Sequence, residues 1–235
     1  MAGFRHGGPR VAGVVQKTSA MASAPDLILA SASPRRRELL ERLGLSLYVS
    51  AADIDETPLP GERPAEYVRR IAGAKCDVVA EATAASAPRM AVLAADTIVI
   101  VAGGDGPEPV HILGKPADAE DARRMLARLA GRRHEVATAY RVRCAGKMIE
   151  RTVTTVVVFR ALTPAEIDAY VASREWQGKA GGYAVQGIAG AFVTELRGSH
   201  TNVIGLPLAE VLADLQALGA LPHYPPGAFG AGPAA

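Results

Sequence analysis

Two long runs of β-favouring residues, His134–Cys144 and Lys147–Phe159, constrain the fold more than any other feature of the sequence. Only Ala145 and Gly146 separate them, so the two runs are predicted to pair as an antiparallel hairpin, although this dipeptide is not the strongest hairpin turn. A further β-branched run at Met90–Val101 predicts a central strand, interrupted at residues 95–97.

Helix signals alternate irregularly with these strands. Proline stands at the expected first helical position at residues 34, 64 and 164, and Thr163 with Glu166 forms a capping box. Short strands are expected at Leu27–Ala30, at Leu45–Ser50 and near Phe192, and helices at Pro34–Gly44, from Pro64 onward, at Asp118–Leu129, at Thr163–Ser173 and at Pro207–Leu218. The pattern predicts an α/β fold with mixed strand directions.

The composition argues against several classes of function. The net charge is +2 over 235 residues, which gives no broad basic surface for DNA or RNA, and 5% aromatic residues offer few platforms for stacked bases. No apolar run reaches the roughly 18 to 20 residues that a membrane span needs. Cys76 and Cys144 are expected to be buried small hydrophobes rather than a disulfide or a reactive thiol. We therefore expect a cytoplasmic protein that binds neither nucleic acid nor membrane.

One domain is expected over residues 26–221, with an extension at each end. Residues 1–25 carry basic residues and no acid, and are interpreted as a disordered extension or as the result of a start codon upstream of Met21. Their composition also resembles that of an organelle transit peptide. Residues 222–235 are rich in Pro, Gly and Ala and are interpreted as a disordered tail.

The segment from Ser31 to Arg36 joins a buried strand to a helix and is typical of an anion site. A helix N-terminus offers unpaired N–H groups and a partial positive charge, and Ser31 and Ser33 add hydroxyl donors. Arg35 and Arg36 in the first turn are unfavourable for the helix unless an anion compensates them. The alternative is a capped surface helix with solvated arginines.

Asp96 and Thr97 lie within an otherwise apolar run. An unpaired buried carboxylate costs roughly several kcal/mol, so Asp96 is expected to be paired, metal-bound or catalytic. The alternative is a strand-end carboxylate at the rim of the sheet. The acidic loop Asp53-Ile54-Asp55-Glu56 fits Mg²⁺ or Mn²⁺, which bind few protein oxygens together with phosphate and water. A solvated acidic turn explains the loop equally well.

Two isolated lysines and a glycine-rich segment are the remaining candidates for a functional site. Lys75 in the middle of a helix is best interpreted, by itself, as a solvated lysine. Lys115 stands between Gly114 and Pro116, which fix the backbone, and an ordinary solvated lysine is the alternative there too. The segment from Gly178 to Gly190 lets the backbone approach a ligand closely, or else forms a mobile surface loop. Its Gln186 offers both a hydrogen-bond donor and an acceptor.

Together these segments resemble the Maf family of nucleotide pyrophosphatases, in order and spacing, from about Leu27 to Leu218. The matching motifs are residues 29–36, 95–97, 114–116, 134–139, 179–187 and 205–208. The resemblance implies a Maf/ITPase-like mixed sheet in two lobes around a central cleft, and hydrolysis of a nucleoside triphosphate to the monophosphate and pyrophosphate with a divalent metal. It also allows a homodimer. Ala32 stands where the family often has glycine.

The resemblance assigns roles to individual residues. Asp96 becomes the proton acceptor, the triphosphate is surrounded by Ser31, Arg35, Arg36, Lys75 and Lys115, and Arg35, Thr97 and Gln186 choose the nucleotide. Glu56 becomes an acidic active-site residue, and Glu56 with Asp96 are the candidate metal ligands.

Gln186 favours dTTP and UTP, because an amide can meet the N3–H donor and the adjacent carbonyl of uracil or thymine, whereas a carboxylate better suits a guanine edge. The alternatives are a 7-methyl-GTP pyrophosphatase of the same family, an enzyme for modified nucleotides, and a non-catalytic nucleotide-binding regulator of septum formation.

Overall fold

The structure, a computed structural model, describes residues 24–102, 110–222 and 224. The extension expected at residues 1–25 and the tail expected at 222–235 therefore lie almost wholly outside the described residues.

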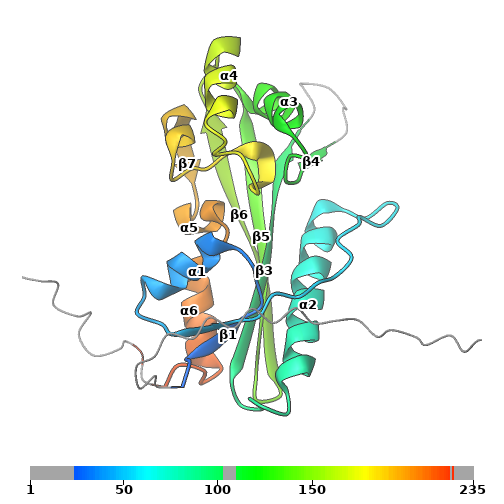
Figure 1. Cartoon of the computed structure of the whole chain (residues 1–235), viewed down its shortest axis with the longest axis vertical. Helices are drawn as coiled ribbons and strands as arrows, with labels where there is room; N and C mark the ends of the chain where they lie inside the picture. The colour runs from blue at the N-terminus through cyan, green and yellow to red at the C-terminus, as the bar shows by residue number, and fades with distance from the viewer. Residues whose placement is uncertain (1–23, 103–109, 223, 225–235) are drawn as a thin grey trace, which may run out of the picture.

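A mixed seven-stranded sheet forms the centre of the molecule, in the order β2-β1-β3-β5-β6-β7 with β4 also paired to β3 (Figure 1). β1 is parallel to β2 and β3, and every other pairing is antiparallel. This confirms the predicted α/β class with mixed strand directions. The strands are β1 Leu27–Leu29, β2 Leu47–Val49, β3 Ala91–Val101, β4 His111–Leu113, β5 Arg133–Cys144, β6 Lys147–Phe159 and β7 Val193–Arg197.

The predicted hairpin is β5–β6, which pairs from Arg133 with Val158 to Cys144 with Lys147. Its two turn residues both have positive φ, 48° for Ala145 and 79° for Gly146. Two positive φ angles match the twist of the flanking strands, and glycine adopts them more easily than alanine.

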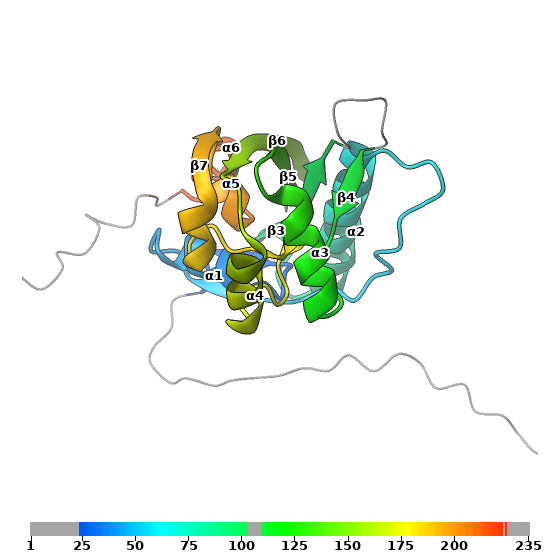
Figure 2. The same ribbon diagram turned by 90° about the horizontal axis from the view of Figure 1, so that it is seen from above.

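Helices cover both faces of the sheet, as Figures 1 and 2 show. α2 packs on one face, α1, α5 and α6 lie on the other, and α3 and α4 lie at the end of the long strands near β4 and β7. The helices are α1 Pro34–Glu41, α2 Pro64–Thr83, α3 Ala119–Leu129, α4 Pro164–Ala172, α5 His200–Ile204 and α6 Leu208–Ala217, with the short 3₁₀ turns η1 Ala180–Gly182 and η2 Ile188–Phe192.

The core follows this layering. Val68 and Ala72 of α2 pack with Ile98 of β3 on one face, whereas Leu93 of β3 packs with Leu215 of α6 on the other. A separate cluster around Phe159 fills the end near α3 and α4. The expected division into two lobes stays a prediction. Cys76 and Cys144 are buried and unpaired, as expected, and burial raises the pKa of the Cys76 thiol to about 12.

Two expectations for individual elements were wrong. β3 runs without interruption through Asp96 and Thr97, because each of them keeps its pairing with β5. β2 is shorter than Leu45–Ser50, since its pairing with β1 ends at Val49. The first helix is regular to Glu41, and Gly44 closes its C-terminus as expected, with a φ of 79° and a 2.9 Å hydrogen bond from its N–H to the carbonyl of Glu41. Within the described ranges, no helix is both long and apolar enough to cross a membrane.

Candidate active site

An uncovered stretch of the β3 edge carries the centre of the site. β5 pairs with one edge of β3 over Val92–Ile100, while on the other edge β1 reaches only Ala91–Leu93 and β4 only Val99–Val101. Among the described strands, Ala94–Ile98 therefore has a neighbour on one side only. Ligands of open α/β sheets bind beyond the carboxyl ends of parallel strands, and β1 ends here at Leu29.

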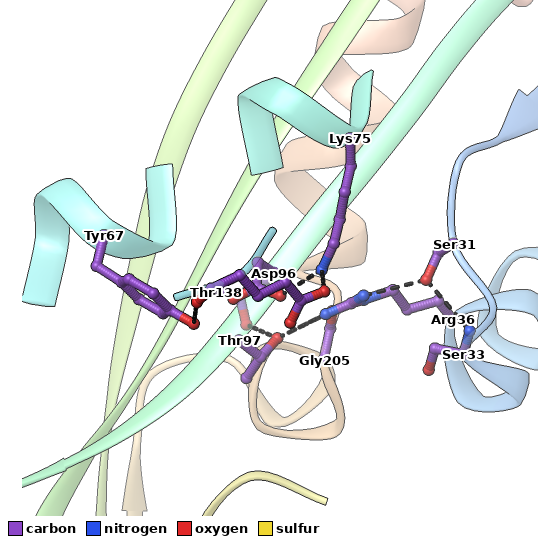
Figure 3. Close-up of polar contacts among 10 residues, drawn as sticks. Ser31, Ser33, Arg36, Tyr67, Lys75, Asp96, Thr97, Thr138 and Gly205 are labelled. Carbon is purple, nitrogen blue, oxygen red and sulfur yellow. Dashed lines mark hydrogen bonds and ion pairs between the residues drawn. The ribbon is translucent and has the colours of Figure 1, made fainter. Parts of the chain in front are cut away.

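Asp96 points from this stretch toward α2 (Figure 3). Its Oδ1 lies 2.9 Å from Nζ of Lys75, and both side chains are nearly buried. The same Nζ lies 2.6 Å from Oε1 of the half-buried Glu56. Burial by itself would raise the pKa of Glu56, but the hydrogen bond and charge of Lys75 outweigh it, so the net pKa is lowered. Two carboxylates thus converge on one ammonium group.

Thr97 points to the opposite face, as alternation along a strand requires. Its Oγ1 accepts a hydrogen bond from Nη2 of Arg36 at 3.0 Å and lies 2.9 Å from Oγ1 of Thr138. Arg36 also donates from Nε to the carbonyl of Gly205 at 2.8 Å and from Nη1 to Oγ of Ser31 at 3.1 Å. Burial lowers the pKa of Arg36, and the charge of Asp96 partly opposes this. The guanidinium is therefore fixed by three separate segments.

The N-terminus of α1 opens toward the same place. Ser33 is the N-cap residue, but its side chain makes no capping hydrogen bond. Its N–H instead donates to Oγ of Ser31 at 3.2 Å, which shapes the strand-to-helix loop. A helix start of this kind presents N–H groups to an anion.

Arg35 and Lys179 form a second, outer pair of cations. Arg35 donates to the carbonyls of Ile204 and Gly178 at 3.4 and 3.3 Å, and Lys179 donates to the carbonyl of Gln177 at 3.3 Å. Burial lowers the pKa of both, and the charge of Arg35 lowers that of Lys179 further. Neither makes an ion pair with a carboxylate in the described part of the chain.

One cavity of about 360 Å³ gathers these groups. It is lined by every residue to which the sequence analysis assigned a role, namely Ser31, Arg35, Arg36, Glu56, Lys75, Asp96, Thr97, Lys115 and Gln186. Apolar side chains including Val99, Val136, Val185 and Val203 line it as well. A triphosphate with an attached base needs this combination of cations and apolar wall.

Two of the alternatives considered for single motifs are wrong, and the acidic loop divides between its two interpretations. Lys75 is nearly buried rather than solvated, and Asp96 lies in the middle of β3 rather than at its end. The acidic loop does not act as a unit, because Asp53 and Asp55 are exposed and only Glu56 reaches the cavity. Asp55 instead accepts the N–H of Thr57 at 2.8 Å, and hydrogen bonding by the side chain and then the backbone of Thr57 lowers its pKa.

Sequence reasoning missed some residues of the cavity. Lys179 received no role, although its place in the glycine-rich motif beside Arg35 was a usable signal. Val203 and Ile204 come from α5, a helix of five residues that was not predicted. Tyr183 lies in a matching motif but received no role, and its hydroxyl lies 2.9 Å from Nε2 of the buried His134.

Comparison with known proteins places the chain in a family. The family model described as "Maf-like protein" matches residues 26–218. A protein named dTTP/UTP pyrophosphatase from Anaeromyxobacter dehalogenans is 52% identical over 200 residues, covering 83% of this chain and 95% of that protein. Proteins of the same name from Sphingopyxis alaskensis and Cereibacter sphaeroides are 53% and 48% identical, each covering 97% of the relative and 83% and 84% of this chain. The chain belongs to the Maf family.

Proposed function

We propose that this protein is a nucleoside triphosphate pyrophosphatase that hydrolyses dTTP and UTP to the monophosphate and pyrophosphate. One observation carries the proposal: nearly buried Asp96, held by Lys75, lies in the same cavity as Ser31, Arg35, Arg36 and Lys115. Relatives that this chain matches over almost their full length are named dTTP/UTP pyrophosphatase, which supports the same reaction.

The cations provide the binding site for the triphosphate. The N-terminus of α1 and the hydroxyl of Ser31 supply hydrogen-bond donors, while Arg35, Lys115 and Lys179 supply charge at the cavity wall. Arg36 has two N–H groups beyond those that it donates to the protein, so it can hold the loop and still face a phosphate. Fixed positive charge of this kind stabilises the negative charge that develops on a departing pyrophosphate.

Asp96 is the group placed to accept a proton. Lys75 engages Oδ1, and Oδ2 has no partner among the described residues, so Oδ2 can orient a water molecule. The water oxygen forms a bond to the α-phosphorus, its proton passes to Asp96, and the bond from the α-phosphorus to the bridging oxygen breaks. The electron pair leaves with pyrophosphate. General-base catalysis of this kind contributes about 10² to 10⁴ in rate.

The donor set also fits a divalent cation. Glu56 and Asp96 each give one oxygen to the ammonium of Lys75, and the second oxygen of each has no partner among the described residues, although both side chains line the cavity. Within the same residues no group of three or more His, Cys, Asp or Glu side chains could hold a metal. Two carboxylates with water and phosphate oxygens suit Mg²⁺ or Mn²⁺, which rarely take a full set of protein ligands. Bound there, the cation would neutralise phosphate charge and make a bound water more acidic.

Gln186 is the side chain that we assign to base recognition. It lines the cavity with the apolar residues that would cover a pyrimidine ring. Its amide can donate to a carbonyl of uracil or thymine and accept from N3–H. Arg35 and Thr97 adjoin the same space, although the Thr97 hydroxyl is already engaged by Arg36 and Thr138.

A pyrophosphate-release screen tests the proposal. The substrates are dTTP, UTP, CTP, 7-methyl-GTP and pseudouridine triphosphate, each with Mg²⁺, with Mn²⁺ and with chelator. We expect dTTP and UTP to be turned over fastest and Asp96→Asn to lose about 10³-fold in kcat while still binding nucleotide. Faster hydrolysis of 7-methyl-GTP would contradict the substrate choice. Binding without hydrolysis by the wild type would favour a regulator.

Location and assembly are part of the proposal as well. We propose that the protein acts in the cytoplasm. We also propose that it forms a homodimer. Fractionation and sedimentation equilibrium are the measurements that decide them.

A further inference from the structure

We propose that Glu175 is a positioning residue that sets nucleobase discrimination by holding the turn that carries Gln186. The inference rests on the proposed function and deepens it. Glu175 does not line the cavity, so it acts through the backbone rather than on the substrate.

Gln186 depends on its backbone for its position. It is the third residue of a turn closed by a 3.0 Å hydrogen bond from the N–H of Gly187 to the carbonyl of Ala184. Its side chain is exposed and makes no hydrogen bond to any described residue. The contacts that hold the two ends of this turn therefore determine where the Gln186 amide can form hydrogen bonds with a base.

The start of the turn is fixed by two tyrosines. The N–H of Ala184 donates to the hydroxyl oxygen of the buried Tyr170 at 3.0 Å. The preceding residue, Tyr183, is buried, and its hydroxyl lies 2.9 Å from Nε2 of His134 on β5. The chain therefore enters the turn from a position set by α4 and by the sheet.

Glu175 fixes the other end. Its Oε2 accepts the N–H of Ile188 at 2.9 Å. A Cβ added to Gly187 would clash with the same Oε2, so the carboxylate rests directly against that glycine. The φ of Gly187 is −113°, outside the left-handed region, so the contact with Glu175 and not a positive φ is what excludes a larger residue here.

The backbone around Glu175 is arranged to place it there. Arg174 has a φ of 62°, in the left-handed region that non-glycine residues seldom adopt. Such a conformation persists only where its surroundings determine it. On the other side, Nε1 of the buried Trp176 donates to the carbonyl of Val171 at 3.0 Å, which ties the segment to α4. Glu175 is thus held in place between Arg174, whose backbone is in the left-handed region, and Trp176, whose side chain is hydrogen-bonded to α4.

The test uses two substrates that differ at one base position, UTP and its N3-methylated analogue, together with inhibition by inorganic pyrophosphate. In the wild type, kcat/KM should favour UTP, because methylation removes the N3–H that Gln186 accepts. Glu175→Ala should reduce this preference about tenfold, the scale of the net contribution of one neutral hydrogen bond. The inhibition constant of pyrophosphate should change less than twofold.

Further variants separate positioning from a general loss of structure. Glu175→Gln keeps an acceptor oxygen for Ile188 and should retain most of the preference. Gly187→Ala displaces the carboxylate and should behave like Glu175→Ala. In a Gln186→Ala background, Glu175→Ala should have no further effect on the preference, since residues that act through one contact are not additive. Glu195→Ala, at an exposed glutamate, is the matched control.

The outcomes of these experiments distinguish a failure of the proposed function from a failure of the positioning role of Glu175. A wild type that hydrolyses neither nucleotide overturns the proposed function. A wild type that prefers UTP, with Glu175→Ala keeping that preference, overturns the positioning role alone. Equal loss for both nucleotides and for pyrophosphate, or full additivity with Gln186→Ala, assigns Glu175 a merely structural role and also overturns it.

Discussion

Nη2 of Arg36 and Oγ1 of Thr97 lie 3.0 Å apart and join α1 to the centre of β3 across 61 positions of sequence. With its bonds to Ser31 and Gly205, Arg36 connects three segments that surround the cavity. Arg36, which the sequence motif predicts to bind phosphate, therefore also holds together the segments that form the phosphate-binding cavity.

Replacing Arg36 by lysine should damage both stability and turnover. Lysine keeps the charge, but a single ammonium cannot reach three acceptors in the directions of a guanidinium. We expect a loss of about 2 kcal/mol in the free energy of unfolding, measured by urea denaturation, and a lower kcat/KM for UTP. Thr97→Val, which removes one of the three contacts, should lose less stability. Equal stability of Arg36→Lys and the wild type would contradict the bracing role.

Lys75→Met should destabilise the fold strongly. It leaves the nearly buried Asp96, and Glu56 beside it, without their shared ammonium, and an unpaired buried charge costs about 3 to 5 kcal/mol. Chemical denaturation at pH 7 measures the loss. In Lys75→Met/Asp96→Asn the buried charge at position 96 is also removed, so the double variant should be more stable than Lys75→Met alone. A double variant that is less stable would show that the ion pair is not the cause.

His134 should make stability fall on mild acidification. Burial lowers its pKa from 6.5 to about 4, so the unfolded chain binds a proton between these values that the folded protein does not. The free energy of unfolding should therefore drop as the pH falls from about 6.5 to about 4, by up to about 3 kcal/mol. His134→Gln should lack this component. Urea denaturation of both proteins at pH 7, 5.5 and 4 gives the difference, and parallel curves would contradict it.

The β5–β6 turn offers a stabilising substitution. Ala145 has a φ of 48°, which is costly for alanine, whereas asparagine adopts such angles readily before a glycine. Ala145→Asn should raise the free energy of unfolding by about 0.5 to 1 kcal/mol, as seen in thermal and urea unfolding. Gly146→Ala places a second alanine at positive φ and should lower it by a similar amount. The turn lies at one end of the hairpin, far along β5 from Thr138, so turnover should be unchanged in both.

Local signals in the sequence predicted most of the scaffold. Proline at the first helical position located α1, α2 and α4, and the capping box of Thr163 and Glu166 is present in the structure. The β5–β6 hairpin also follows from local residue preferences. In contrast, α5 has only five residues, too few to repeat a helical pattern long enough to be detected.

The site could be predicted only in part. An isolated carboxylate in an apolar run identified Asp96 without further information. Lys75 could not be identified in the same way. Its burial depends on how α2 packs against β3, and its partner Asp96 lies 21 positions away on another element, so the residues beside Lys75 give no sign of the ion pair. The internal bonds of Arg36 depend likewise on Gly205, which lies 169 positions away.

The short length of β1 and β4 has an architectural consequence. They approach each other along the same edge of β3 from opposite ends, and the space between Leu93 and Val99 is all that separates them. Extending either strand by two residues would cover part of the Ala94–Ile98 stretch with backbone and narrow the site without altering any catalytic side chain. Insertions and deletions near Ala30 or Leu113 should therefore be tolerated far less than changes at the outer end of the β5–β6 hairpin.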